Sequence, residues 1–162
     1  MPMDKQQEQK EPMTKDRLCS YIGIQLRVQR REERLMRMRS NAEMPAGKVS
    51  DGSKHIVTGY DRMGNAVIKL MEYENKIRES MTADKAELAA IESAIDSIRD
   101  PIEQEVLRLR YTETTENNRR LRWRDVALRM YHDDSEADVL RVQRIHQKAV
   151  ECITLGGGQG MK

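Results

Sequence analysis

Residues 101–153 of the chain read PIEQEVLRLRYTETTENNRRLRWRDVALRMYHDDSEADVLRVQRIHQKAVECI. Apolar residues recur here every three or four positions in three segments separated by polar breaks, which predicts three helices. The last segment, Val139 to Val150, has apolar residues on one face and Arg, Gln, His and Lys on the other. A helix in the DNA major groove needs one face for its own domain and another for base edges and phosphates. The stretch therefore predicts a helix-turn-helix.

The inner faces of these three helices follow from the spacing of their apolar residues. They are expected to consist of Ile102, Val106, Leu109 and Tyr111 in the first, Trp123, Val126, Ala127 and Met130 in the second, and Val139, Val142, Ile145, Ala149 and Ile153 in the third. A small residue such as Ala127 lets two helices cross closely, as a helix-turn-helix requires. Arginines at positions 119, 120, 122 and 124 cluster just before or within the second helix, where phosphates could be met.

The polar residues left for the outside are the candidate DNA contacts. They are Arg122, Arg124, Arg141, Gln143, Arg144, His146, Gln147 and Lys148. We expect Arg144 and Gln143 to approach base edges, and Arg122, Arg124 and Lys148 to contact phosphates. The alternative is an ordinary solvated face on a three-helix bundle, and helical periodicity alone does not separate the two interpretations.

The segment before this stretch predicts a sharp junction. Proline disfavours a helical conformation in the residue before it but fits the first position of a helix, so Asp100-Pro101 should end one helix and begin another. Asp100 is the expected N-cap, and Glu103 stands where a capping box would place it. The junction is therefore interpreted as a bend between two rigid helices.

Residues 61–99 carry the most regular periodicity in the chain and predict one continuous helix. Spacings of four and three alternate along the seam formed by Met63, Val67, Leu70, Glu74, Ile77, Met81, Asp84, Leu88, Ile91, Ile95 and Ile98, a pattern typical of a coiled coil. Glu74 and Asp84 interrupt the seam. Such residues either select register and oligomeric state or lie at a solvated edge of the seam.

A shorter helix should precede it, from Thr14 as N-cap to about Ser40, with a loop from Asn41 to about Ser53. The two helices are expected to pair as an antiparallel hairpin. The longer helix would leave its last isoleucines (Ile91, Ile95, Ile98) without a partner in the shorter one. The C-terminal helices or a second subunit would then cover them, which makes a homodimer through the hairpin a hypothesis.

Composition narrows the functional classes. The chain has 162 residues, of which 35% are charged, with no Phe and a net charge of +2, so any nucleic-acid site must be local. The two cysteines, Cys19 and Cys152, and the scattered histidines lack metal-ligand spacing, so we expect no metal, no cofactor and no enzymatic activity. His132 beside Asp133 could form only a weak cation site. No apolar run is long enough to span a membrane, which predicts a cytoplasmic protein.

The order PIEQEVLRLRY, WRDVALRM, VQRIHQKAV resembles the sigma-factor domain that reads the upstream promoter element. It is more similar still to the small sigma-like regulators of phages and prophages of Gram-positive bacteria, in the group that includes ArpU- and RinA-type late-gene regulators. The resemblance covers about the last fifty residues, because the N-terminal half is similar only in its helical layout. It implies a phage-type transcription regulator in a bacterial cytoplasm, double-stranded DNA as partner, RNA polymerase as a further candidate, and a DNA-reading helix over about Asp138 to Ile153.

Two segments depart from the family pattern. The turns after Tyr111 and after Met130 are longer, and the second adds acids at positions 133, 134, 136 and 138 that repel phosphate. The expected organisation is an all-α chain with a disordered tail over 1–13, a helical hairpin over 14–99, a helix-turn-helix DNA-binding domain over 100–155 and a disordered tail over 156–162. The competing functions are a small terminase-like DNA-packaging adaptor and a protein-interaction module with a degenerate helix-turn-helix.

Overall fold

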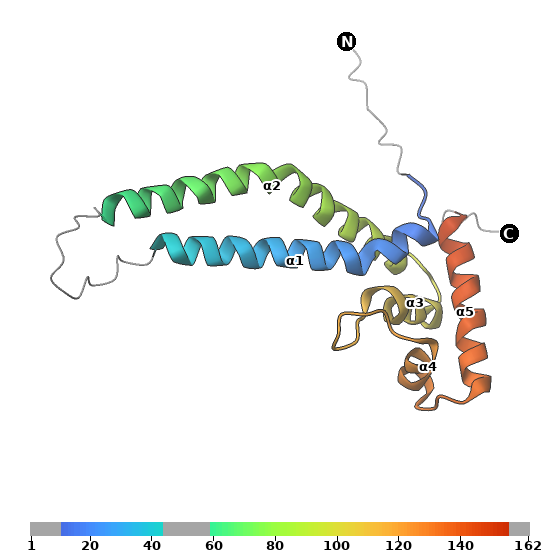
Figure 1. The fold of residues 1–162 in the computed structure, drawn as a ribbon. Helices are drawn as coiled ribbons and strands as arrows, with labels where there is room; N and C mark the ends of the chain where they lie inside the picture. The colour runs from blue at the N-terminus through green and yellow to red at the C-terminus, as the bar shows by residue number, and fades with distance from the viewer. Residues whose placement is uncertain (1–10, 44–58, 156–162) are drawn as a thin grey trace, which may run out of the picture. The chain divides into compact units, whose positions relative to one another are not determined.

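In a computed structural model the chain is all-α, as predicted (Figure 1). Its helices are α1 (Lys15–Glu43), α2 (Gly59–Asp96), α3 (Pro101–Leu107), α4 (Trp123–Tyr131) and α5 (Glu136–Thr154), and a π-helical turn (Arg108–Thr112) follows α3. The structure describes residues 11–43 and 59–155, with side chains in the second range from Met63 onward. Within these ranges the only β-type pairing is one bridge between Thr114 and Arg120. No helix there is long and apolar enough to cross a membrane.

Helix α1 begins where the sequence predicts. The Arg17 backbone N–H donates to Thr14 Oγ1 at 3.3 Å, which makes Thr14 the N-cap. The helix ends at Glu43, so residues 41–43, predicted as loop, are helical. The rest of the predicted loop, from residue 44 to Ser53, lies outside the described residues.

Helix α2 is one uninterrupted helix, and Met81 and Thr82 lie within it. It ends at Asp96, a few residues before the predicted end. The cause is the approach to Pro101, since the residue before a proline avoids the helical conformation. Asp100 is extended, and its carboxylate accepts the Ile102 backbone N–H at 2.9 Å, so the predicted cap of α3 is confirmed.

The chain divides into two compact units that do not follow the predicted domain boundary at residues 99 and 100. One unit, here called the hairpin unit, is Gly23–Leu88. The other, the C-terminal unit, combines Met1–Ile22 with Ala89–Lys162. The first turns of α1 and the last turns of α2 therefore belong with α3, α4 and α5.

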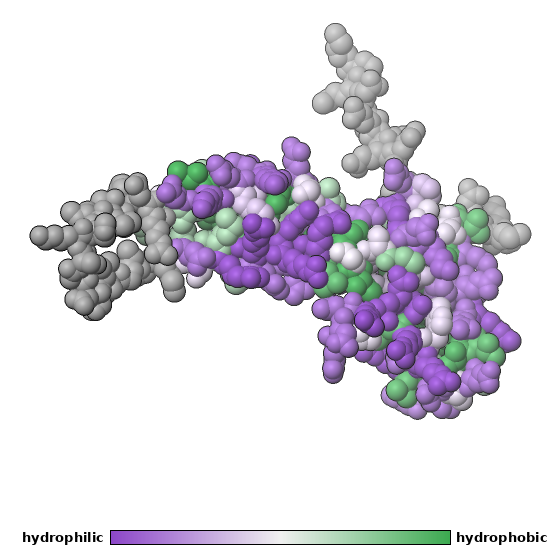
Figure 2. Space-filling view, in the orientation of Figure 1, coloured by the Kyte–Doolittle hydropathy of each residue, from purple (hydrophilic) through white to green (hydrophobic). Residues whose placement is uncertain are grey.

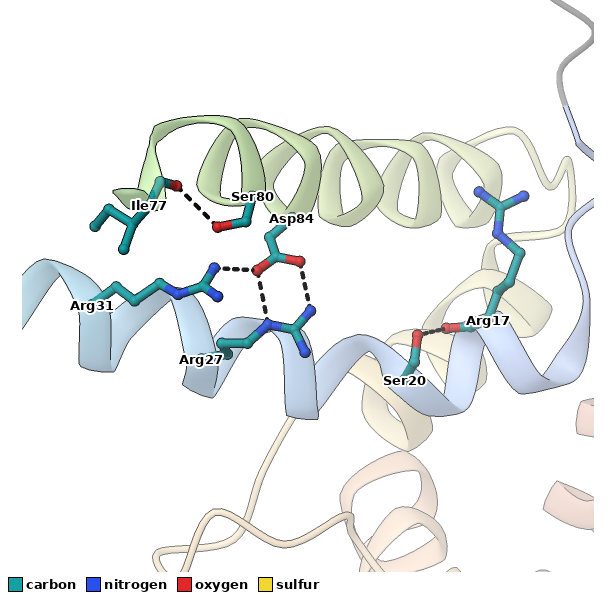
Figure 3. Close-up of polar contacts among 7 residues, drawn as sticks. All are labelled: Arg17, Ser20, Arg27, Arg31, Ile77, Ser80 and Asp84. Carbon is teal, nitrogen blue, oxygen red and sulfur yellow. Dashed lines mark hydrogen bonds and ion pairs between the residues drawn. The ribbon is translucent and has the colours of Figure 1, made fainter. Parts of the chain in front are cut away.

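In the hairpin unit, α1 and α2 pair in antiparallel fashion. Arg39 pairs with Glu74 at 2.7 Å and Arg27 with Asp84 at 2.5 Å, so rising numbers in α1 meet falling numbers in α2. The Asp84 side chain is only 13% exposed, and Arg31 pairs with it as well (Figure 3). An acid held in this way fixes the register of the two helices, so the alternative of a solvated edge does not describe Asp84.

The predicted seam of α2 is buried unevenly. Ile77 is buried, whereas Met63 and Val67 are 48% and 41% exposed. Exposed Ile68 and Met71 adjoin them, and Figure 2 shows apolar side chains near the first turns of α2. The seam is therefore covered only in its later turns.

In the C-terminal unit, one apolar core joins the last three helices and the turns between them. Its buried members are Val106, Leu109, Leu121, Val126, Ala127 and Val142. Ile102, predicted for this core, is 48% exposed, and Leu107 is fully buried instead. The reason is that the buried face of α3 is centred on Glu103, Val106 and Leu107, at spacing i, i+3 and i+4.

The last isoleucines of α2 are covered within a single chain. Ile91 and Ile95 are 0% and 1% exposed and belong to the C-terminal unit. Beside them the Tyr21 hydroxyl donates to Glu92 Oε1. Of the two predicted covers for these residues, a second subunit is therefore not needed.

Candidate nucleic-acid interface

Local capping fixes where α4 and α5 begin and end. The Arg122 backbone N–H donates to Asp125 Oδ2 at 2.9 Å and so starts α4. His132 follows α4 in the left-handed conformation, with φ of 58°, and turns the chain. Ser135 Oγ then accepts the Asp138 backbone N–H at 3.4 Å, and α5 begins at Glu136. The connection between the helices is residues 132–135, because much of the longer segment expected from the sequence is itself helical.

The structure exposes most of the predicted contact residues, but not all. The exposed ones are Arg122, Arg124, Arg141, Arg144, Gln147 and Lys148. Gln143 is half-buried, and His146 is buried with 7% exposure. The side chains of Arg124 and Arg144 make no ion pair or hydrogen bond within the described part of the chain.

His146 is a core residue, so its prediction as an outward DNA contact is wrong. Its Nε2 is joined by a 2.8 Å hydrogen bond to the Tyr111 hydroxyl, and its ring lies 4.8 Å from that of Trp123 in an edge-to-face arrangement. The polar character of its side chain led to the prediction of an outward position. Its position one turn after Val142 and three residues before Ala149 in fact puts it on the buried side.

Burial also sets the ionisation of this core pair. Burial, together with the nearby charges of Lys15, Arg110 and Arg120, lowers the pKa of His146 to about 4. Burial raises the pKa of Tyr111 to about 12. Both side chains are therefore neutral at pH 7, and the imidazole offers no cation to a phosphate.

Lys148 is already engaged by a carboxylate. Its Nζ lies 2.6 Å from Oε1 of Glu103, a side chain that is only 7% exposed. The predicted capping box is therefore replaced, since Glu103 reaches α5 instead of the start of its own helix. A phosphate at Lys148 would compete with this buried carboxylate, which pairs with no other cation in the described part of the chain.

The fold separates the arginines at positions 119, 120, 122 and 124, which were predicted to form one cluster where phosphates could be met. Arg120 is half-buried: it donates to the Cys19 carbonyl at 3.1 Å and lies 5.4 Å from the centre of the Tyr111 ring. Arg119, Arg122 and Arg124 remain exposed. Arg110, which the sequence analysis did not single out, donates to the Leu121 carbonyl and covers the Trp123 ring at 4.2 Å.

A shallow hollow brings together residues from three helices of the C-terminal unit. Gln143 and Gln147 of α5, Trp123 of α4 and Lys15 of α1 line it, and it encloses about 490 Å³. The two amides are one helical turn apart and can donate and accept hydrogen bonds, as base edges require. Lys15 was missed because it is more than a hundred residues away in sequence and no local pattern links it to α5.

Acidic side chains oppose anion binding at the start of α5. Asp133, Asp134 and Glu136 are exposed there, although acids favour the helix dipole at this end. Of the candidate cations, Arg141 is the nearest in sequence to these acids, and its guanidinium lies 4.8 Å from the centre of the Tyr131 ring. Arg124 and Arg144 are exposed and lie outside this acidic segment.

The described residues contain no cluster of three or more His, Cys, Asp or Glu side chains arranged for a metal ion. Comparison of the chain with protein-family models, with curated proteins and with solved structures finds no match.

Proposed function

We propose that this chain is a phage-type DNA-binding transcription regulator that uses α4 and α5 as a sigma-like helix-turn-helix and controls late phage gene expression. One observation carries the proposal. Arg124 and Arg144 are exposed on the two helices whose buried residues Val126, Ala127 and Val142 build one core, and neither makes an ion pair or hydrogen bond with another residue that the structure describes. An unpaired guanidinium on a rigid element is suited to a phosphate or to the O6 and N7 atoms of guanine.

The exposure and the ion pairs of the candidate contacts guide the role that we propose for each. Arg144 and Gln143 are assigned to base edges, with Gln147 beside them, and Arg122 and Arg124 to phosphates. His146 is not proposed as a DNA contact because it is buried. Lys148 is not proposed as a phosphate contact because it pairs with Glu103. Arg141 stays a candidate, with its guanidinium resting on Tyr131.

Fluorescence anisotropy with short promoter duplexes of different sequence tests the proposal. Arg144→Ala should lose about 1–3 kcal/mol of discrimination between sequences. Arg124→Ala should weaken binding evenly to all sequences and make the dependence on salt less steep. No duplex binding at low ionic strength, or parental binding by both variants, would refute the regulator.

The exposed acids at positions 133, 134 and 136 repel phosphate groups, so the intrinsic affinity of the chain for DNA should be weak. We expect measurable binding mainly at low salt, since binding through phosphates weakens steeply as salt rises. A second site on the chain, dimerisation or contact with RNA polymerase would then supply the remaining affinity in the cell.

A DNA-packaging adaptor is the second candidate, and the exposed apolar face of α2 favours it. Met63, Val67, Ile68 and Met71 are each more than 40% exposed, which is unusual for residues of this kind on one short stretch of helix. This face could join copies of the chain. A dimer in solution fits the regulator, whereas a closed ring of many subunits would favour the adaptor.

A further inference from the structure

Arginines recur on one face of α1. Arg27, Arg30, Arg31, Arg34 and Arg37 follow the spacing i, i+3, i+4, i+7 and i+10, which places them in one row along a helix. The row extends over about 15 Å at 1.5 Å per residue. It lies in the hairpin unit, away in sequence from the candidate contacts on α4 and α5.

The row borders a groove between the two helices of the hairpin unit. Arg27, Arg30, Arg31 and Arg34 of α1 and Tyr73 of α2 line it, and it encloses about 500 Å³. Four arginine side chains therefore line the groove. Its size exceeds what a single ion requires.

The acids within reach neutralise only part of this charge. Asp84 accepts from Arg27 Nε at 2.8 Å and Nη2 at 2.5 Å, and from Arg31 Nη1 at 2.8 Å (Figure 3). Arg30 has no ion pair among the residues described, and Arg34 contacts only the Tyr73 ring, at 4.5 Å. Among the described residues, Asp84 is the acid that pairs with arginines of the groove, and Arg37, the last arginine of the row, pairs with Glu33 at 3.8 Å.

The same contacts hold the guanidinium groups in place before a ligand arrives. Asp84 binds Arg27 through two parallel hydrogen bonds and leaves other N–H groups of both arginines free. The Tyr73 ring supports Arg34 from one side. Side chains that are already ordered lose less entropy on binding, so an anion gains more affinity from them.

We infer that this groove, here called the arginine groove, binds the phosphate backbone of double-stranded DNA. A planar guanidinium matches two phosphate oxygens, and a row of arginines matches a chain of phosphates. Single-stranded nucleic acid is less suited, because its proteins offer free aromatic faces for stacking, and Arg34 occupies a face of Tyr73. The inference rests on the proposed function only for duplex DNA as the ligand; the groove itself is a second, independent contact surface.

The test measures binding of the full chain to a fluorescent duplex over a range of salt concentrations. Arg30→Ala/Arg34→Ala should weaken binding at least tenfold at low salt. The slope of log Kobs against log salt should become less steep by about 1.8, because each phosphate that the protein no longer neutralises reduces it by about 0.9. Arg30→Lys/Arg34→Lys should keep most of the slope, since a lysine still contacts phosphate as a point charge.

A charge-matched control comes from another face of α2. Arg78→Ala/Lys85→Ala removes the same charge at exposed positions that do not line the groove. It should leave the slope within experimental error of the parent. Helical circular dichroism equal to the parent confirms that each variant is folded. A slope that changes equally in the groove and control variants, or in neither, would overturn the inference.

A third variant separates this inference from the proposed function. If Arg124→Ala/Arg144→Ala abolishes binding and the groove variant binds like the parent, the regulator stands and the groove assignment fails. If only the groove variant loses binding, the groove assignment stands and the proposed role of α4 and α5 fails. If the parent binds poly-glutamate as tightly as duplex, and the groove variant loses both, the ligand is an acidic protein segment and the DNA assignment fails.

Discussion

His146 links the stability of the C-terminal unit to pH. Its imidazole titrates near 6.5 in an unfolded chain and near 4 in the folded one, so the unfolded state takes up the proton first as pH falls. The free energy of unfolding should therefore decrease between about pH 6.5 and pH 4, by at most about 3 kcal/mol from this residue. Urea unfolding at pH 7 and pH 4.5 measures the change.

The matched variant for this measurement is His146→Gln, which keeps a polar partner for Tyr111 and does not titrate. Its stability should fall less on acidification than that of the parent. Carboxylates such as Asp84 contribute equally to both proteins, so the difference between them isolates the imidazole. Identical losses in the two proteins would contradict the assignment of His146 as a buried neutral base.

Asp84 should contribute more to stability than other ion-paired acids of the hairpin unit. Asp84→Asn leaves Arg31, whose side chain is 23% exposed, without its carboxylate, and should cost about 1–3 kcal/mol. Glu32→Gln breaks the exposed pair with Lys85 and should cost less than about 1 kcal/mol. Thermal unfolding of the two variants compares the sites directly, and a larger loss in Glu32→Gln would reject this ranking.

At the scale of single elements, the stability of α3 depends on its N-cap, Asp100. Asp100 satisfies the free N–H of Ile102 at a helix only seven residues long. Asp100→Ala should lower the free energy of unfolding by about 1 kcal/mol, whereas Asp100→Asn should keep most of it, because asparagine caps equally well. Chemical denaturation tests both variants, and equal losses would show that charge rather than capping is responsible.

The extent of the helices follows from local signals, and so could be predicted. Thr14 and Asp100 cap their helices, and the seam from Met63 onward predicted α2 as one helix, all of which the structure confirms. What could not be predicted is which face each residue turns to where several helices meet. Periodicity gives a stripe some 100° wide, and a residue at its edge, such as Ile102, is decided by partners distant in sequence. His146 was assigned outward because its side chain is polar, although its spacing from Val142 and Ala149 places it within the buried stripe.

The charged residues show the same limit. Lys148 was assigned to phosphate, and Arg120 belonged to a cluster where phosphates could be met, yet Arg120 rests on Tyr111 and Lys148 pairs with Glu103. Neither partner lies within a helical turn of its arginine or lysine, so no local spacing reveals the contact. The arginine row of α1, by contrast, has a clear local signal at spacing i, i+3, i+4 and i+7, and a search for periodic charge as well as periodic apolarity would have found it.

At the scale of the whole molecule, the exposed apolar face of α2 predicts self-association. If Ile68 and Met71 join two copies, sedimentation velocity should show a dimer in the micromolar range, and Ile68→Ser/Met71→Ser should shift it to monomer. Leu155→Ser, at an equally apolar position that is 86% exposed at the end of α5, serves as control. A parent that sediments as a monomer at high micromolar concentration would rule out this dimer.

The C-terminal unit is assembled from both ends of the described chain, and this has a consequence during protein synthesis. Arg120 donates to the Cys19 carbonyl across a separation of 101 residues, and Leu18 and Tyr21 are buried in the same unit. A ribosome releases the N-terminal residues first. Leu18 and Tyr21 therefore remain exposed to solvent until the later helices of this unit have been synthesised. The nascent chain thus exposes an apolar segment during much of its synthesis. Chaperones can bind this segment, and it can also pair wrongly with neighbouring nascent chains on the same messenger RNA.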